Sequence, residues 1–154
     1  MLDERAITTA EALRRDMAER EHERLRRSVE RRRREEAARR ERLRRFLLDR
    51  LTRADFRAMR RRVLAAARDG AFETELMRFP STLCIDDGRA VNNGLPGWEA
   101  SLPGKARRAH AIWRRVERRK GFRLSARILD YPGGEPGDVG LFLSWAPPAT
   151  TRGQ

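Results

Sequence analysis

The side chains best suited to binding chemistry lie between Ser101 and Arg127, and nearly all of the charged ones are cations. This stretch holds ten Lys plus Arg and a single acid, Glu117, which gives a formal charge of +9. Arginine presents a planar fork of N–H donors that fits phosphate or carboxylate oxygens. We therefore expect this stretch to bind a polyanion, with RNA or a ribosomal surface ahead of duplex DNA. The candidate contacts are Arg107, Arg108, Arg114, Arg115, Arg118, Arg119, Arg123 and Arg127.

A simpler explanation is that these arginines form the solvated outer face of an amphipathic helix. Its inner stripe would be Ala109, Ile112, Trp113 and Val116. The scarcity of acids favours binding, because a merely solvated face usually mixes both signs. The sequence contains no zinc finger, no RRM-type aromatic motif and no GXXG loop. Aromatic residues for base stacking are few, and Phe142 is a candidate on the open face of a sheet.

A second cluster of arginines lies in the N-terminal third, where acids accompany it. Residues 1–53 contain 18 Arg and 12 Asp plus Glu. Acids four residues before arginines, such as Glu30 before Arg34, favour a helix. The arginines of this helix are most closely spaced at Arg31, Arg32, Arg33 and Arg34, which are therefore its candidate nucleic-acid contacts. This helix would be a solvated spacer, an arm lying along phosphates, or one half of a helix pair. A coiled-coil seam is interrupted, because residues 30–42 offer only Ala37 and Ala38 as apolar residues.

The end of this predicted arm carries a candidate protein-interaction patch. The residues share one helical face and are Leu43, Phe46, Leu47 and Leu51. The patch would dock the arm onto the following domain or onto a second copy or partner. It supports the alternative function, an assembly or adaptor protein that uses the helix as an interaction or oligomerisation arm.

An enzyme is the least favoured class, and the sequence predicts no catalytic residue, no metal site and no cofactor. The acids to consider are Asp86, Asp87, Asp130 and Asp138, and the other candidates are Arg78, Arg89 and His110. Acids before a helix or in a turn usually cap backbone N–H groups. Cys84 has apolar neighbours, which suits an inert buried thiol. The residues Arg78, Asp86, Asp87 and Arg89 form a possible ligand loop. If this loop binds no ligand, we expect internal salt bridges to hold it in place.

The elements that must position these residues indicate an α+β fold. After a long charged helical arm we expect a helix over residues 54–68, with a capping box from Thr52 to Asp55. Strands are predicted over 74–79, 123–131 and 139–145, with a short helix near 87–92 and a long one over 102–120. The predicted domains are an arm (1–51), a two-layer domain (52–147) and a flexible tail (148–154). The domain would hold a three-stranded, mostly antiparallel sheet with helices on one face.

Composition limits the remaining possibilities. The chain has 154 residues and a formal net charge of +13. Arginine accounts for all but two of its 36 basic residues, a bias that a GC-rich genome would also produce. A single cysteine excludes an intrachain disulfide and suits a reducing compartment. The sequence shows neither a secretory h-region at its N-terminus nor an apolar run long enough to cross a bilayer, so we predict a cytoplasmic protein.

Overall fold

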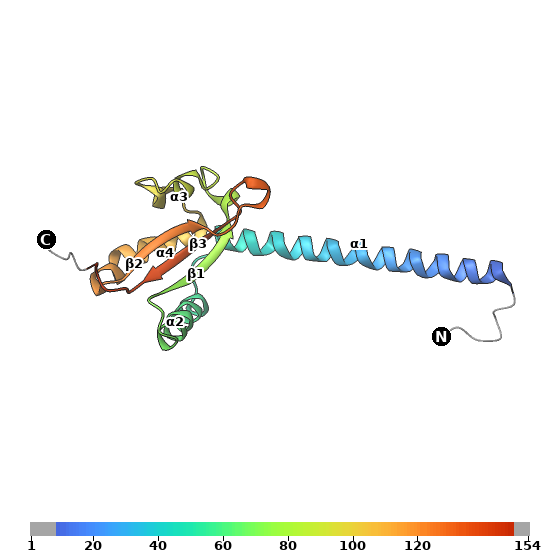
Figure 1. Cartoon of the computed structure of the whole chain (residues 1–154), viewed down its shortest axis with the longest axis horizontal. Coiled ribbons are helices and arrows are strands. Elements are labelled where there is room, and N and C mark those ends of the chain that lie inside the picture. The colour runs from blue at the N-terminus through green and yellow to red at the C-terminus, as the bar shows by residue number, and fades with distance from the viewer. Residues whose placement is uncertain (1–8, 150–154) are drawn as a thin grey trace. The chain divides into compact units, whose positions relative to one another are not determined.

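The computed structural model describes residues 9–149, and it confirms the predicted α+β class. Four α-helices and three strands follow one another in these described residues (Figure 1). Their bounds are α1 Ala10–Leu48, α2 Arg53–Arg68, β1 Glu73–Pro80, α3 Arg89–Asn92, α4 Gly104–Arg115, β2 Arg123–Ile128 and β3 Asp138–Ser144. Predictions that concern residues 1–8, and most of the predicted tail, lie outside the described range.

The chain separates into two compact units between Arg42 and Leu43, so the last residues of α1 belong with everything that follows them. The first unit is the rest of the 39-residue α1 helix, which has no buried residue. Several of the predicted ion pairs form along it, including Asp16–Arg20 at 2.9 Å and Glu30–Arg34 at 2.9 Å. No Pro or Gly interrupts the helix, so local propensity and these pairs sustain it.

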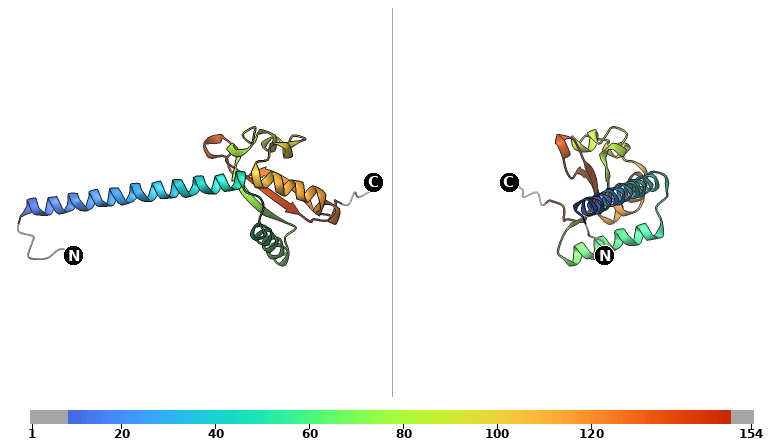
Figure 2. Two further views of the ribbon diagram at one scale, coloured as in Figure 1. Left: turned by 180° about the vertical axis from the view of Figure 1, so that it is seen from behind. Right: turned by 90° about the vertical axis from the view of Figure 1, so that its right-hand side faces the viewer.

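The second unit is organised on a three-stranded antiparallel sheet in the order β1-β3-β2. The central strand β3 carries Val139, Leu141 and Leu143 at alternate positions, and these face the core. Leu143 pairs with Leu124 on one side and with Thr74 on the other. Figure 2 shows α4 lying across one face of the strands.

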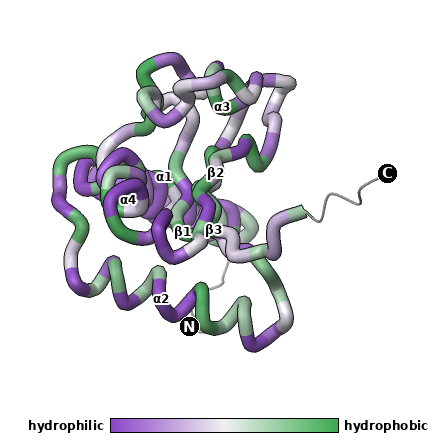
Figure 3. The backbone as a smooth tube through the Cα atoms, turned by 90° about the vertical axis from the view of Figure 1, so that its left-hand side faces the viewer, coloured by the Kyte–Doolittle hydropathy of each residue, from purple (hydrophilic) through white to green (hydrophobic). Residues whose placement is uncertain are grey.

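The core lies between this sheet face and the helices. Phe79, Leu102, Val139 and Leu141 are almost fully buried, and Ala106 and Ala109 bring α4 close to the sheet. Figure 3 shows hydrophobic and hydrophilic residues interspersed along α2, whose Val63 packs on the core only in part. The core is therefore small, and α2 contributes no fully buried residue to it.

The start of α2 confirms the predicted capping box. The Thr52 hydroxyl accepts the backbone N–H of Asp55 at 3.1 Å, and the Asp55 carboxylate accepts the backbone N–H of Thr52 at 2.8 Å. Lys105 of α4 adds a salt bridge to the same carboxylate at 2.9 Å. Burial would raise the pKa of Asp55, but the hydrogen bonds from Thr52 and Lys105 outweigh it and lower that pKa.

The helix predicted over 102–120 is shorter than expected. α4 ends at Arg115, Val116 is its C-terminal cap, and a 3₁₀ turn, η3, runs through Glu117–Lys120. The Trp113 indole N–H donates to the Phe122 carbonyl at 2.8 Å, which ties the end of α4 to the start of β2. The strand predicted to Tyr131 also ends early, at Ile128, and just beyond it the Asp130 carboxylate accepts the backbone N–H of Asp138.

Candidate functional site

Exposed arginines on α4 and η3 form a strongly positive surface on the second unit. Arg107, Arg114, Arg115, Arg118 and Arg119 are all exposed. None of the five makes a hydrogen bond or ion pair through its side chain with another residue in the range 9–149. Arg123, at the start of edge strand β2, is also exposed and joins them, and its guanidinium group donates one hydrogen bond to the Ala146 carbonyl at 3.0 Å. We call these six residues the basic surface.

Two shallow depressions divide the basic surface and meet at His110 and Arg114. One has a volume of about 650 Å³ and includes Arg118 and Arg123. The other has a volume of about 740 Å³ and includes Arg107, Arg115 and Arg119. The fold therefore gathers cations from a helix, a 3₁₀ turn and a strand around hollows wide enough to admit phosphate groups.

Two acids lie close to this surface, but they do not neutralise its positive charge. Glu117 forms a salt bridge to Lys120 at 3.1 Å, so it neutralises a lysine outside the basic surface. Glu99 lines both depressions. One carboxylate against six guanidinium groups leaves a strong excess of positive charge.

His110 lies between two tryptophan rings at the centre of the basic surface. Its ring centroid is 6.0 Å from that of Trp98 and 5.5 Å from that of Trp113. Burial lowers the pKa of His110, and neighbouring Arg114 lowers it further, while Glu99 acts in the opposite direction. His110 is therefore neutral at pH 7, and these rings place an aromatic edge beside the guanidinium groups.

Two of the predicted contacts do not belong to the basic surface. Arg108 is half-buried and donates to the Leu47 carbonyl at 3.4 Å. Arg127 lies on the opposite face of the sheet, where it covers the Phe142 ring and pairs with Glu73. Phe142 itself is 8% exposed beneath Arg127, so the stacking role predicted for it was wrong.

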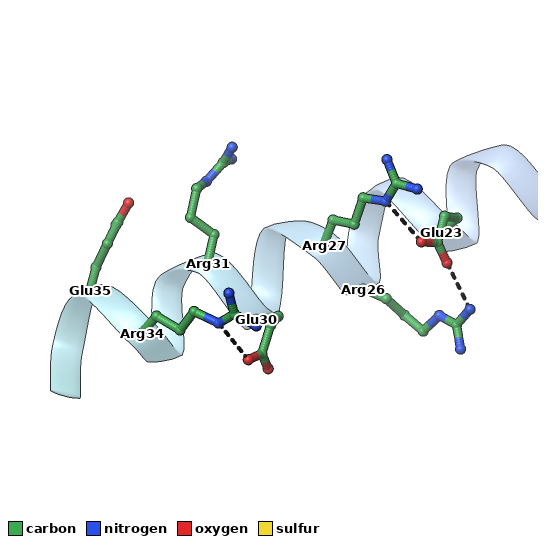
Figure 4. Close-up of a pocket in the computed structure, with 7 residues that line it drawn as sticks. All are labelled: Glu23, Arg26, Arg27, Glu30, Arg31, Arg34 and Glu35. Atoms are coloured by element: carbon green, nitrogen blue, oxygen red, sulfur yellow. Dashed lines mark hydrogen bonds and ion pairs between the residues drawn. The ribbon is translucent and has the colours of Figure 1, made fainter. Parts of the chain in front are cut away.

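Figure 4 shows arginines and glutamates side by side along α1, some of them joined in ion pairs. Glu23 accepts hydrogen bonds from Arg26 and Arg27, which lower the pKa of its carboxyl group. Arg34 pairs with Glu30. Arg31, Arg32 and Arg33 are exposed and form no ion pair with another described residue, so they are the part of the predicted cluster that remains available.

The predicted protein-interaction patch is largely used inside the second unit. Phe46 stacks on Phe79 with 5.2 Å between ring centroids, and Leu51 packs on the same core. Leu43 is half-buried, and Leu47 retains 37% exposure. This patch was expected to dock either onto the following domain or onto a second copy or partner. The structure shows Phe46 and Leu51 packed on the core of the domain.

The residues of the predicted ligand loop do not converge. Arg78 forms a two-pronged contact with Glu75 on the open face of the sheet, at 3.0 and 3.2 Å. Asp86 accepts the backbone N–H groups of Gly88 and Ala90, which caps α3. Asp87 and Arg89 form no ion pair with each other or with the rest of residues 9–149. Of these four residues, Arg78 forms the kind of salt bridge that was expected, and Asp86 instead holds the loop through backbone N–H groups.

The groups considered for catalysis are also dispersed. The Asp130 carboxylate accepts a hydrogen bond from the backbone N–H of Asp138 at 2.6 Å. Cys84 is buried, and burial with nearby Asp86 and Asp87 raises the pKa of its thiol to about 11. Within residues 9–149, no cluster of three or more His, Cys, Asp or Glu side chains is placed to hold a metal ion.

Sequence reasoning missed two parts of this site. Trp98 precedes α4 in the loop and gave no periodic signal that would place it against His110. The second is a groove between α2 and α4. It could not be predicted from the sequence, because it depends on how the two helices are placed relative to each other in the fold. The spacing of His110 and Trp113, three residues apart on one helix, did offer a signal for the aromatic cluster.

No helix in the described part of the chain combines the length and apolar character needed to span a bilayer. Comparison with known proteins finds no family model, curated protein or solved structure that matches this chain.

Proposed function

We propose that this protein binds a phosphate-rich polyanion through the basic surface, without catalysing a reaction, and that RNA is favoured over duplex DNA. The observation that carries the proposal is the absence of ion pairs at the five exposed arginines of α4 and η3 within the described residues. Guanidinium groups without carboxylate partners are ready to exchange counterions for phosphates.

The preference for RNA rests on the aromatic cluster. Trp113 and His110 line the depression that also holds Arg118 and Arg123. Unstacked bases of a single strand can lie against such rings while guanidinium groups contact the phosphates. A continuous duplex keeps its bases stacked and offers only its backbone to this surface. On α1, Arg31, Arg32 and Arg33 would supply further, sequence-independent phosphate contacts.

Purification gives the first test of this proposal. Nucleic acid that copurifies at low salt raises the 260/280 nm absorbance ratio, and we expect a high-salt wash to remove it. A labelled single-stranded RNA of about 20 nucleotides, followed by fluorescence anisotropy, then measures affinity, with duplex DNA of the same length as comparison. Tighter binding of the duplex would contradict the preference for RNA.

Charge reversal identifies the surface that binds. The triple variant Arg114→Glu, Arg115→Glu, Arg118→Glu should lose at least about a hundredfold in affinity, because three phosphate contacts become repulsions. A variant with the same charge change on α2, Arg57→Glu, Arg61→Glu, Arg68→Glu, controls for net charge. Equal losses in the two variants would show that total charge matters and the basic surface does not.

A second candidate function is the assembly or adaptor role, and exposed apolar side chains on α1 favour it. Met17, Leu25 and Val29 are 67%, 56% and 50% exposed. Large apolar residues on a charged helix can pair with a partner helix. Sedimentation of the full chain at 0.5 M salt tests this role: a stable oligomer that Leu25→Asp dissociates would support it, and a monomer at all concentrations would contradict self-assembly.

A further inference from the structure

An apolar groove runs between α2 and α4 above the core face of the sheet. Its volume is about 520 Å³. Val63 and Leu64 of α2 form one wall, Ile112 and Trp113 of α4 form the other, and Leu124 and Leu143 of the sheet line it as well. The lining residues come from α2, β1, α4, η3, β2 and β3, so the groove exists only in the folded protein.

The groove leaves apolar surface uncovered. Phe56 and Leu64 are 42% and 44% exposed, although both lie on the apolar side of α2. α2 has no buried residue, so its amphipathic face lacks the cover that a packed helix normally has. Contiguous exposed apolar surface of this kind marks interaction sites on soluble proteins.

The edges of the groove carry positive charge. Arg60 lines the groove from α2, and helical spacing places Arg57 and Arg61 on the side of Leu64 that faces away from the groove. On the other wall, Arg115 follows Ile112 by three residues and faces solvent. The acid of the groove, Glu117, is already paired with Lys120. An occupant with acidic flanks is therefore complementary to this site.

We propose that this groove binds an amphipathic helix of a partner protein, whose apolar side chains enter between α2 and α4 and whose flanking acids meet the arginines. A helix suits the site because the groove lies on a sheet face, where helices pack, and not along a strand edge. Anchors at i, i+3 or i+4, and i+7 would fill the apolar floor.

The same charge argument disfavours a second copy of this chain as the occupant. α1 is the long exposed helix that a second copy would offer, and it contains 15 Arg against 9 Asp plus Glu. A cationic helix would be repelled by the arginines on both edges of the groove. The partner is therefore a different, acidic chain.

A designed peptide probes the site. It has about 18 residues, with Leu at i, i+3, i+7 and i+10 on one face, Glu and Ala elsewhere, and a fluorescent label. Anisotropy at 150 mM salt should show saturable binding. A peptide of the same composition with the leucines scattered around the helix should bind at least about tenfold more weakly, because charge alone remains.

Two variants locate the peptide on the protein. Leu64→Glu puts a carboxylate in the groove and should weaken binding by at least about tenfold. Ile85→Glu makes the same kind of change at a 79% exposed residue outside the groove and should leave affinity within about twofold. Circular dichroism confirms that both variants are folded, and Phe56→Gln serves as a milder second substitution in the groove.

The contradicting results are equally distinct. Failure of the patterned peptide to saturate, equal binding of the scattered peptide, or indifference to both Leu64→Glu and Phe56→Gln would overturn the proposal. A dimer of the chain alone that Leu64→Glu dissociates would assign the groove to a second copy instead. The double variant Arg114→Glu, Arg118→Glu should bind the peptide normally, so this proposal and the RNA-binding proposal can fail independently.

Discussion

The guanidinium carbon of Arg127 lies 3.6 Å from the centre of the Phe142 ring, and the same guanidinium group pairs with Glu73. β3 lies between β2 and β1, so Arg127 crosses the central strand to reach an acid on the far one. This arrangement covers the open face of the sheet with a partnered charge. It separates Arg127 from the basic surface on α4, although both belong to one basic stretch of sequence.

We therefore expect Arg127 to stabilise the fold and to contribute little to the proposed binding of a polyanion. We expect Arg127→Gln to lower the free energy of unfolding by about 0.5–1.5 kcal/mol, from the lost contacts with Phe142 and Glu73. RNA affinity should change by less than about threefold, whereas Arg118→Gln should weaken binding more with little effect on stability. Urea denaturation and RNA anisotropy on both variants check this exchange of roles. The opposite pattern would return Arg127 to the binding surface.

Gly104 begins α4 against the backbone of Phe46, and a Cβ atom there would collide with the Phe46 carbonyl. Its φ of +41 adds a conformation that side-chain-bearing residues rarely adopt. Gly104→Ala should cost more than about 2 kcal/mol, because the collision is with backbone that cannot move aside easily. Gly70→Ala is the control, since Gly70 also has positive φ but open space around it. Equal costs in thermal or urea unfolding would show that the contact with Phe46 is unimportant.

His110 should make stability depend on pH. Its folded pKa lies below the usual value of 6.5, so around and below that pH the unfolded chain binds more protons than the folded one. The contribution of His110 to the free energy of unfolding is therefore complete above pH 6.5, and it is lost as the pH falls through the folded pKa. Urea unfolding at pH 7.5 and at pH 5.5 should show a smaller difference for His110→Asn than for the original chain.

The same residue should couple pH to binding. A phosphate beside His110 favours its protonated form, so RNA affinity should rise between pH 7.5 and pH 5.5 by more than it does for His110→Asn. Anisotropy at constant ionic strength measures both proteins. Identical pH profiles would place the polyanion away from His110.

Cys84 should be chemically inert in the folded protein. Burial and the carboxylates of Asp86 and Asp87 raise the pKa of its thiol to about 11, so the reactive thiolate is rare at pH 8. Iodoacetamide should label it at least about a hundredfold more slowly than in 6 M urea, as mass spectrometry can follow. Rapid labelling under native conditions would show that the loop around Cys84 opens readily.

Local signals account for what the sequence predicted correctly. Thr52 and Asp55 mark a helix start through contacts three residues apart, and the alternation of Leu124, Ala126 and Ile128 marks a strand with one buried face. The end of α4 was missed because it depends on Trp113 reaching the Phe122 carbonyl, a contact made across a turn.

Sequence charge alone could not show which arginines have partners in the folded protein. Arg108 reaches a carbonyl at the end of α1, and Arg127 reaches an acid two strands away, so both have partners that only the tertiary fold supplies. The arginines of α4 that face solvent stayed exposed, as expected of residues off the apolar stripe. The groove between α2 and α4 has no signature in sequence, because its two walls are separated by the first strand and the long loop.

The salt dependence of RNA binding tests the basic surface most directly. If all six of its arginines contact phosphates of a single strand, the logarithm of affinity should fall against the logarithm of salt concentration with a slope of roughly −4. The triple variant Arg114→Glu, Arg115→Glu, Arg118→Glu should flatten that slope to about −2 or less. A slope in the original chain near zero, or one that the triple variant leaves unchanged, would contradict the proposal that this surface binds a polyanion.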